Sequence, residues 1–274
     1  MIVATTIAAV REALAPAHAA SAPIAFVPTM GALHDGHVSL LRAARAPGGR
    51  VVASIFVNPA QFTDPADLAQ YPRQEERDLA LARDAGVDVM FMPDAAEIYP
   101  PGFATSLEMS GAAAGFESDH RPGHFDGVAT VCLKLFNIIR PAVVLLGQKD
   151  AQQVAVLRQL VRDLNLDIEI RVGPTVRDSD GVALSSRNLR LSAAERTQAQ
   201  TIPKALAAAV RAHRRGADPV AAARQALQSM TIEYADVATF DGEPTLVLAV
   251  RVGSMRLIDN VPLTRPERAG LVTV

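Results

Sequence analysis

The chain has 274 residues, of which 49% are hydrophobic, which suits two unequal domains with a substantial core. Its 27 lysines and arginines against 29 acidic residues give a net charge of −2, which excludes a general attraction to nucleic acid or to anionic membranes. Its one cysteine, Cys132, excludes an intramolecular disulfide and is compatible with a reducing compartment. The uncharged stretch 13–33 contains three prolines and is no spanning helix, and no basic segment of a signal peptide precedes residues 1–10. We therefore expect a cytoplasmic protein.

Short apolar runs alternate with helical patterns as far as residue 172. Strands are predicted at 23–27, 51–57, 87–92, 142–146 and 166–172. Helices are predicted at 38–46, 79–85, 128–139 and 152–164. Near-continuous apolar strands separated by helices indicate a parallel sheet covered on both faces, so we predict a doubly wound α/β domain over residues 1–175.

The pattern changes after Val176. An alanine-rich helical stretch is predicted at 193–215, with an interruption at Pro203, and a second helix at 220–230. Strands are predicted at 234–240 and 246–252, and the pattern at 255–258 is compatible with a third. This predicts a smaller α+β domain over residues 176–274.

Three predicted strands of the first domain are followed by segments rich in glycine, amides, histidine or lysine. These segments are 28–37, 58–62 and 147–150. In an open parallel sheet, ligands bind beyond the carboxyl ends of the strands. We therefore expect the three segments to face one cleft.

His34 and His37 lie three residues apart, just before a predicted helix. On the first turn of a helix they share one face, where the backbone and the helix dipole favour anions. Gly31 and Gly36 would allow a phosphate to approach the backbone closely. Two alternatives stay open: ordinary surface histidines, or a metal site to which His120 and His124 add ligands.

Lys149 directly follows a strand, between Gln148 and Asp150. It is either a point charge for a phosphate oxygen or a solvated lysine at a strand end. Asp150 is suited to cap the next helix, to contact a ribose or to help hold Mg²⁺, and the sequence does not choose among these roles.

Two further groups of polar residues complete the candidate site. The segment Ser185, Ser186 and Arg187 is suited to close over a triphosphate, or is a polar linker. Gln61 and Gln153 are neutral amides that suit a substrate carboxylate or hydroxyl, although either fits an ordinary helix surface.

Taken together, these segments resemble the pantothenate synthetase family of ligases. The matching motifs run in the family's order and cover nearly the whole chain. They are PTMGALHDGH at 28–37, SIFVNPAQF at 54–62, YPR at 71–73, EIYP at 97–100, RPGHFDGV at 121–128, GQKDAQQ at 147–153, DGVALSSRN at 180–188 and RLIDN at 256–260. The HxGH element alone marks a broader nucleotidylyltransferase superfamily, whereas the ordered set is specific.

The resemblance implies a Rossmann-like domain with a C-terminal lid, Mg²⁺ and ATP, and a homodimer. It implies a reaction of pantoate with β-alanine through a pantoyl adenylate. His37, His34 and Lys149 are implied as catalytic, with His37 similar to the family's proton donor. Residues implied to bind ATP are Met30, Gly31, Ala32, Leu33, His34, Asp35, Gly36, His37, Gly147, Gln148, Lys149, Asp150, Val176, Leu184, Ser185, Ser186 and Arg187. Pantoate is placed on Gln61 and Gln153, and β-alanine near Gln61 and Asn58.

The chain departs from the family pattern at two positions. Gln148 stands where many members have Glu, and Ala151 where an aromatic residue is common. The Mg²⁺ ligands and the roles of Arg121 and His124 are left open. Two rival functions also remain: a nucleotidylyltransferase that needs no amine, and a nucleotide-binding module without catalysis.

Overall fold

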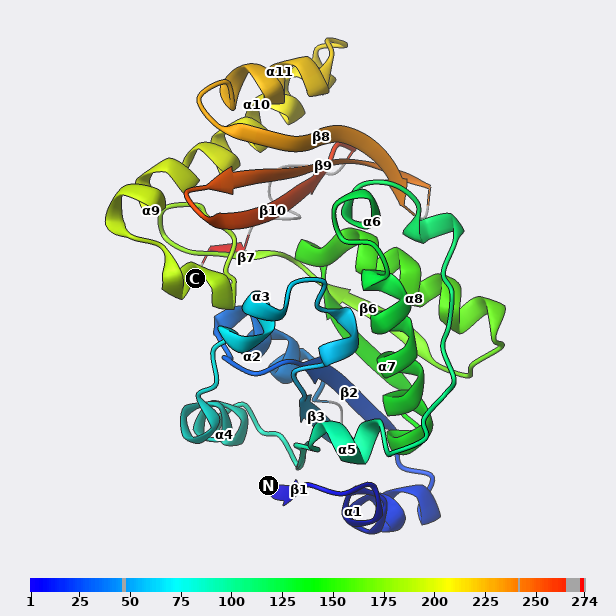
Figure 1. Cartoon of the computed structure of the whole chain (residues 1–274). Coiled ribbons are helices and arrows are strands. Elements are labelled where there is room, and N and C mark those ends of the chain that lie inside the picture. Colours follow the sequence, from blue (N-terminus) through cyan, green and yellow to red (C-terminus); the bar gives the residue numbers. More distant parts are fainter. Residues whose placement is uncertain (46–47, 241, 265–271, 274) are drawn as a thin grey trace. The chain divides into compact units, whose positions relative to one another are not determined.

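The computed structural model describes residues 1–45, 48–240, 242–264 and 272–273 (Figure 1). The chain forms two compact units that interleave along the sequence. The first unit comprises Met1–Leu33, His37–Leu146 and Gln152–Gly173. The second comprises His34–Gly36, Gly147–Ala151 and Pro174–Val274. The expected domain boundary at residue 175 stays a prediction.

The first unit is built on a six-stranded sheet in the order β1-β4-β3-β2-β5-β6. The pairs β1 with β4, β4 with β3, β3 with β2, and β2 with β5 are all parallel. The strands are β1 (Ile2–Ala4), β2 (Ile24–Thr29), β3 (Arg50–Ile55), β4 (Val89–Phe91), β5 (Val143–Gly147) and β6 (Glu169–Gly173). The predicted Rossmann-like α/β class is confirmed. The edge strand β1 was not predicted, because three residues are too few for a periodic pattern.

Alternate side chains of the strands enter two separate cores. Phe26 and Val144 belong to a core shared with α1 (Ile7–Ala19), α7 (His124–Ile139) and α8 (Ala151–Asp163). Their chain neighbours Val27 and Leu145 belong to a second core. That core includes residues of α2 (Asp35–Ala43) and α4 (Glu75–Asp84). Both faces of the sheet are therefore covered, which explains why its strands read as continuous apolar runs.

Several helices of the first unit differ from the prediction, and α4 and α7 each begin four residues before their predicted starts at 79 and 128. Helix α2 begins at Asp35, three residues before the predicted start, and ends at Ala43. The predicted end at residue 46 lies outside the described residues. Helix α1 was missed, because Pro16 lies inside it and an internal proline normally argues against a helix. The side chain of Thr6 caps its amino end by accepting the N–H of Ala9.

The second unit contains a three-stranded antiparallel sheet in the order β10-β9-β8. Its strands are β8 (Thr231–Phe240), β9 (Glu243–Val252) and β10 (Met255–Pro262). One face shares a core with residues of α10 (Thr201–Arg214) and α11 (Pro219–Ala226). The short strand β7 (Val176–Arg177) pairs in parallel with β11 (Val272–Thr273). The predicted α+β character of this part is confirmed.

The interruption predicted at Pro203 is in the wrong place. Helix α9 (Ala193–Ala199) ends before Gln200, and α10 begins at Thr201 with Pro203 in its first turn. Proline is tolerated there because the first N–H groups of a helix have no acceptor within the helix. The break between the two helices is thus at Gln200, three residues before the predicted position at Pro203.

Seven short elements complete the described chain. They are η1 (Pro59–Gln61), α3 (Pro65–Ala69), α5 (Ala95–Ile98), η2 (Gly111–Ala113), α6 (Glu117–His120), η3 (Gln148–Asp150) and η4 (Ser186–Arg190). Within the described ranges, no helix is both long enough and apolar enough to cross a membrane.

Candidate active site

The strand order of the first unit reverses at β2. Strands β3 and β4 follow on one side of β2, whereas β5 and β6 lie on the other. The carboxyl ends of β2 and β5 are therefore neighbours at a topological switch point, where doubly wound sheets bind ligands. The expected segments 28–37 and 147–150 begin at these two ends, and 58–62 follows β3. A single cleft lined by all three stays a prediction.

The turn after β2 is held in a tight backbone conformation. Gly31 has a φ of +85°, and a Cβ there would lie 3.0 Å from the Cγ2 of Ile55. The hydroxyl of Thr29 accepts the N–H of Gly31 and donates to the carbonyl of Ser54. Ala32 also has a positive φ of 49°, which few non-glycine residues adopt. This turn delivers the chain into α2.

Both candidate histidines lie at the amino end of α2. His34 immediately precedes the helix, and His37 is its third residue. A Cβ on Gly36 would lie 2.9 Å from the Cε1 of His34 and 3.9 Å from the Cβ of Val176. Glycine at position 36 is therefore required for the imidazole of His34 to keep its place.

Lys149 lies in the same compact unit as His34. The segments His34–Gly36 and Gly147–Ala151 both belong to the second unit, whereas His37 belongs to the first. The Nζ of Lys149 lies 3.3 Å from the Oδ1 of Asp150, and its side chain is 20% exposed. Since Asp150 is half exposed, this ion pair is weak and leaves the ammonium available to a stronger anion.

The backbone beside Lys149 is held by Asn260, a residue of the RLIDN motif. The Nδ2 of Asn260 donates to the carbonyls of Gln148 and Lys149, at 2.9 and 2.8 Å. The Oδ1 of Asn260 accepts from the Nε2 of Gln148 at 3.3 Å. The buried amide thereby fixes η3, and sequence reasoning gave it no role.

Gln61 and Asn58 form a buried amide cluster in the first unit. Asn58 donates through Nδ2 to the Oε1 of Gln61 at 2.9 Å and to the carbonyl of Gly127 at 3.2 Å. Its Oδ1 accepts from the hydroxyl of Tyr99 and from the N–H of Ala60. Burial raises the pKa of Tyr99 to about 12, so this hydroxyl stays a donor. Asn58 is 1% exposed and fully hydrogen-bonded, which suits positioning of Gln61 better than direct contact with a substrate.

The amide nitrogen of Gln61 points at a weak acceptor. Its Nε2 lies 3.4 Å from the Sδ of Met30, in the turn after β2. A thioether accepts a hydrogen bond poorly, so the donor is suited to take a carboxylate or hydroxyl of a ligand instead. This geometry favours the predicted role of Gln61, which stays a prediction.

Arg121 and His124, whose roles the sequence left open, hold the main chain of Gln61. The Nδ1 of His124 lies 2.9 Å from the Gln61 carbonyl, and the Nη2 of Arg121 donates to the same oxygen at 3.2 Å. With Nδ1 as the donor, Nε2 of His124 accepts from the Nη1 of Arg121 at 3.2 Å. The imidazole is therefore neutral in this arrangement.

The neighbouring residues Gln152 and Gln153 differ in their surroundings. Gln152 is buried, donates to the carbonyls of Ala112, Ala114 and Gly115, and accepts the N–H of Glu117. Gln152 therefore holds the backbone of residues 112–117, which precede α7, by hydrogen bonds. Gln153 is half-buried, and its predicted contact with pantoate stays a prediction.

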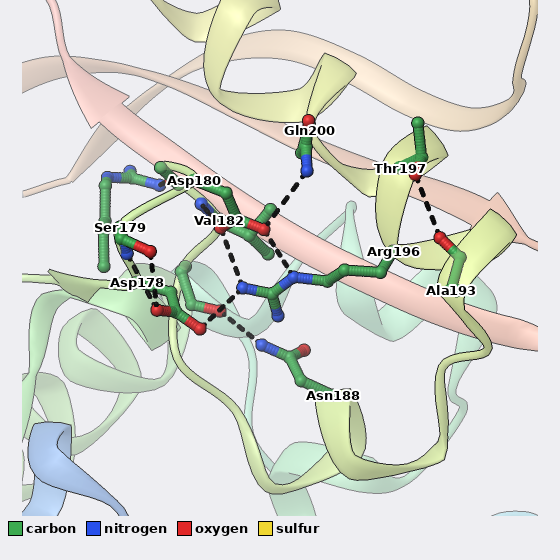
Figure 2. A network of polar contacts seen from close by, with 12 residues as sticks. Asp178, Ser179, Asp180, Val182, Asn188, Ala193, Arg196, Thr197 and Gln200 are labelled. Atoms are coloured by element: carbon green, nitrogen blue, oxygen red, sulfur yellow. Dashed lines mark hydrogen bonds and ion pairs between the residues drawn. The ribbon is translucent and has the colours of Figure 1, made fainter.

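The loop of Ser185, Ser186 and Arg187, predicted to close over a triphosphate, lies within the second unit. The N–H of Leu184 donates to the carbonyl of Val176 at 2.9 Å, and the hydroxyl of Ser185 caps η4 by accepting from Arg187. Next to this loop, Arg196 of α9 donates to both Asp178 and Asp180 (Figure 2). The chain before Ser186 is thus tied to α9, and contacts of the loop with ATP stay a prediction.

Three residues that matter for this geometry were given no role from the sequence, although Gly127 and Asn260 lie in two of the quoted motifs. Asp78 of α4 accepts the backbone N–H groups of Ala32 and Leu33. Gly127 of α7 lies so close to η1 that a Cβ would be 2.3 Å from the Ala60 carbonyl. Asn260 is the third. Each contacts a segment that is distant in the sequence, and Gly127 gave no local signal because it lies one residue before the helix predicted at 128–139.

The structure gives no support to a metal centre built by the protein alone. Among the residues it describes, no group of three or more His, Cys, Asp and Glu side chains is placed to hold a metal ion. His124 instead binds the Gln61 carbonyl. Cys132 is buried, and burial raises its pKa to about 12, so the thiol is not a reactive group.

Comparisons with known proteins agree on one family. The family profile described as pantoate–β-alanine ligase matches residues 2–262. The chain is 47% identical to a pantothenate synthetase of Rhizorhabdus wittichii, over 92% of this chain and 94% of the relative. It is 48% identical to that of Corynebacterium glutamicum, over 96% and 100%.

Solved structures give the same result. The crystal structure of pantothenate synthetase from Thermus thermophilus is similar with a TM-score of 0.90 and 38% identity, covering 97% of this chain and 100% of that one. The pantoate–β-alanine ligase of Francisella tularensis, complexed with β-γ ATP and β-alanine, has a TM-score of 0.83 and 35% identity, covering 97% and 99%.

Proposed function

Because the chain belongs to the pantoate–β-alanine ligase family, we propose that it is the ligase that joins pantoate to β-alanine, using ATP through a pantoyl-adenylate intermediate. The observation that carries this proposal is the amide of Gln61, whose donor faces Met30 in the turn that leads into the HxGH histidines. A donor for a small carboxylate thus lies beside a segment suited to phosphates. The complex of the Francisella tularensis relative supports ATP and β-alanine as ligands.

In the first half-reaction, a carboxylate oxygen of pantoate attacks the α-phosphorus of ATP. The new P–O bond gives pantoyl adenylate, and the bond to pyrophosphate breaks. Since an anion meets an anion, positioning and charge neutralisation dominate the barrier. In this proposal His34, Lys149 and Arg187 neutralise the phosphates, and His37 donates a proton or hydrogen bond to the leaving pyrophosphate. Gln61 and Gln153 aim the pantoate carboxylate.

In the second half-reaction, the neutral amine of β-alanine attacks the acyl carbonyl. A C–N bond forms, the bond to AMP breaks, and the proton that the amine loses is released to solvent. Gln61, with Asn58 behind it, is proposed to lie near β-alanine. The products are pantothenate, AMP and pyrophosphate.

Mg²⁺ is proposed to enter as the Mg–ATP complex, and therefore as part of the substrate. Mg²⁺ commonly keeps several waters and binds through substrate phosphates with one or two carboxylates. Asp150, half exposed beside Lys149, is the carboxylate that fits this role.

The test is ATP–pyrophosphate exchange with pantoate, followed by AMP release with and without β-alanine. The ligase requires pantoate for exchange and β-alanine for rapid AMP release. A nucleotidylyltransferase would form its adduct without any effect of the amine, and a silent module would bind ATP without turnover.

Lys149→Ala is expected to reduce exchange by roughly 10²–10³-fold, the scale of a lost preorganised electrostatic donor. Unchanged exchange in this variant would remove Lys149 from the mechanism.

We also propose a homodimer, on the family resemblance alone. Light scattering on the purified chain, at several concentrations, measures this directly. A mass of one chain throughout would contradict it.

A further inference from the structure

We propose that Asp78 is a positioning residue for catalysis, which holds the turn of residues 30–33 in the shape that presents the HxGH segment to ATP. This inference rests on the proposed function, because it assigns the turn a nucleotide to bind. Asp78 lies on α4, which is distant from this turn in the sequence, and no motif used above includes it.

The contacts of Asp78 are short and are directed at the backbone. Its Oδ2 accepts the N–H of Ala32 at 2.7 Å, and its Oδ1 accepts the N–H of Leu33 at 2.7 Å. The side chain is 1% exposed. Hydrogen bonds to an ionised acceptor are stronger than neutral ones, and burial removes competition from water. The carboxylate therefore determines the direction of two consecutive peptide groups.

The turn needs such an external support because its conformation is not a preferred one. Gly31 and Ala32 both have positive φ values, 85° and 49°. For an alanine this conformation is unfavourable, and it persists only where surrounding contacts impose it. Asp78 supplies those contacts at Ala32 itself and at the next residue. Loss of the carboxylate would let residues 30–33 relax toward an ordinary turn.

This arrangement also restricts which groups can bind phosphate. The N–H of Gly31 donates to Thr29, and those of Ala32 and Leu33 donate to Asp78. None of these three donors therefore points at a nucleotide in this conformation. The turn contributes by placing the start of α2, where His34 and His37 lie, rather than by binding through its own backbone. The N–H groups of Ala32 and Leu33 are therefore not expected to bind ATP in this conformation, although the resemblance places both residues at the ATP site.

Asp78→Asn is the minimal test, because it keeps the volume and replaces one acceptor oxygen by an NH₂ group that faces a backbone N–H. Asp88→Asn is the matched control. Asp88 belongs to the same unit and also accepts a backbone N–H, that of Val51 at 2.8 Å. It precedes β4, at the amino ends of the strands, away from the proposed site.

The measurements are the KM for ATP in pantoate-dependent exchange, the Kd of a non-hydrolysable ATP analogue, and the thermal midpoint. We expect Asp78→Asn to raise KM and Kd together by about tenfold or more, since small displacements of a positioning segment have effects of this size. Asp88→Asn should lower the midpoint by several degrees and leave both constants within about twofold.

A purely structural role for Asp78 predicts a different result, namely a lower midpoint with unchanged KM and Kd in the folded protein. That result would overturn the inference, as would equal effects of the two variants on KM and Kd. Should Asp78→Asn not fold, Gly31→Ala replaces it, because the added Cβ would lie 3.2 Å from the Oδ2 of Asp78 in a strained conformation. An unchanged KM and Kd in that variant also overturns the inference.

If the wild-type protein binds the analogue and catalyses exchange, a failure here leaves the proposed function intact. If it does neither, both fail.

Discussion

The amide nitrogen of Asn260 lies 2.8 Å from the carbonyl oxygen of Lys149, and 2.9 Å from that of Gln148. A strand of the C-terminal sheet thereby fixes the backbone of the lysine that the proposed mechanism places on the phosphates. The lysine side chain itself makes only a weak ion pair with Asp150. Its position therefore depends on its backbone, and hence on Asn260.

Asn260→Asp is predicted to reduce exchange by roughly 10–100-fold, because a carboxylate donates to neither carbonyl and the backbone of Lys149 shifts. The measurement is kcat for pantoate-dependent ATP–pyrophosphate exchange, beside a circular dichroism spectrum that verifies folding. Asn137→Asp, at an exposed position on α7, is the control and should behave as wild type. Full activity of a folded Asn260→Asp protein would contradict the role of Asn260.

Gln148→Glu is predicted to destabilise the protein, although the family resemblance implies Glu at this position. Here the Nε2 of Gln148 donates to the Oδ1 of Asn260, and a carboxylate would place two acceptors against each other. The loss is about 1 kcal/mol for one hydrogen bond, or a thermal midpoint lower by ~2–4 °C. Differential scanning calorimetry measures it. A higher midpoint would mean that the Asn260 amide rearranges to accommodate Glu.

The sequence alone was sufficient to predict the α/β fold and the smaller α+β part, because both depend on local periodicity. Apolar runs such as those of β2 and β5 are continuous because both faces of the sheet are covered. The family resemblance then supplied the candidate site residues. What it could not supply is how those residues are held.

The supports of the site were missed because they are tertiary contacts between polar groups. Asp78, Asn260 and Gln152 each bind backbone groups of a distant segment. Asn260 and Gln152 lie in quoted motifs, but a motif does not indicate which backbone groups a side chain binds. The start of α2 was misplaced for a related reason. Asp35 and Gly36 carry no apolar periodicity, so the pattern showed only the part of the helix that packs against the core.

Gly127→Ala is predicted to reduce the free energy of unfolding by about 3 kcal/mol, the upper part of the range for overpacking. The added Cβ would lie 2.3 Å from the Ala60 carbonyl, and rigid backbone cannot yield as a side chain can. Since Asn58 donates to the Gly127 carbonyl, KM for pantoate should rise as well. Urea denaturation and exchange kinetics measure the two effects, with Asn137→Ala on the same helix as control. A variant as stable as wild type would show that α7 and η1 move apart easily.

The protein is predicted to lose stability as the pH falls below about 4, because Asp180 becomes protonated and its stabilising contribution is lost. Burial alone would raise the pKa of Asp180, but the hydrogen bonds from Arg196 and the N–H of Val182 outweigh it and lower the pKa overall. A carboxyl whose pKa is lower in the folded state contributes stability above its unfolded pKa of about 3.9. That contribution is lost as the pH falls through the folded pKa.

Asp180→Asn should therefore flatten the acid limb of stability. Urea denaturation between pH 2 and pH 7 measures this, with Asp236→Asn on β8, outside the arginine network of Figure 2, as the control. The difference in stability between wild type and Asp180→Asn should shrink as the pH falls. A constant difference at every pH would show that the ion pair with Arg196 is not formed in solution.

Arg177 and Asp259 form a buried two-point ion pair, at 2.6 and 3.1 Å, with side chains 6% and 2% exposed. Burial alone would lower the pKa of Arg177, but the charge and hydrogen bonds of Asp259 raise it overall, so the guanidinium stays charged. Removing one charge leaves the other buried without compensation, so Asp259→Leu and Arg177→Met should each reduce the free energy of unfolding by about 3–5 kcal/mol. The double variant should recover most of that loss, because an apolar pair of similar volume has no charge to desolvate. Urea denaturation of all four proteins gives the coupling energy. Additive losses in the double variant would mean that the pair is not a mutually dependent unit, and that Asp259 acts chiefly by accepting the N–H of Asn260.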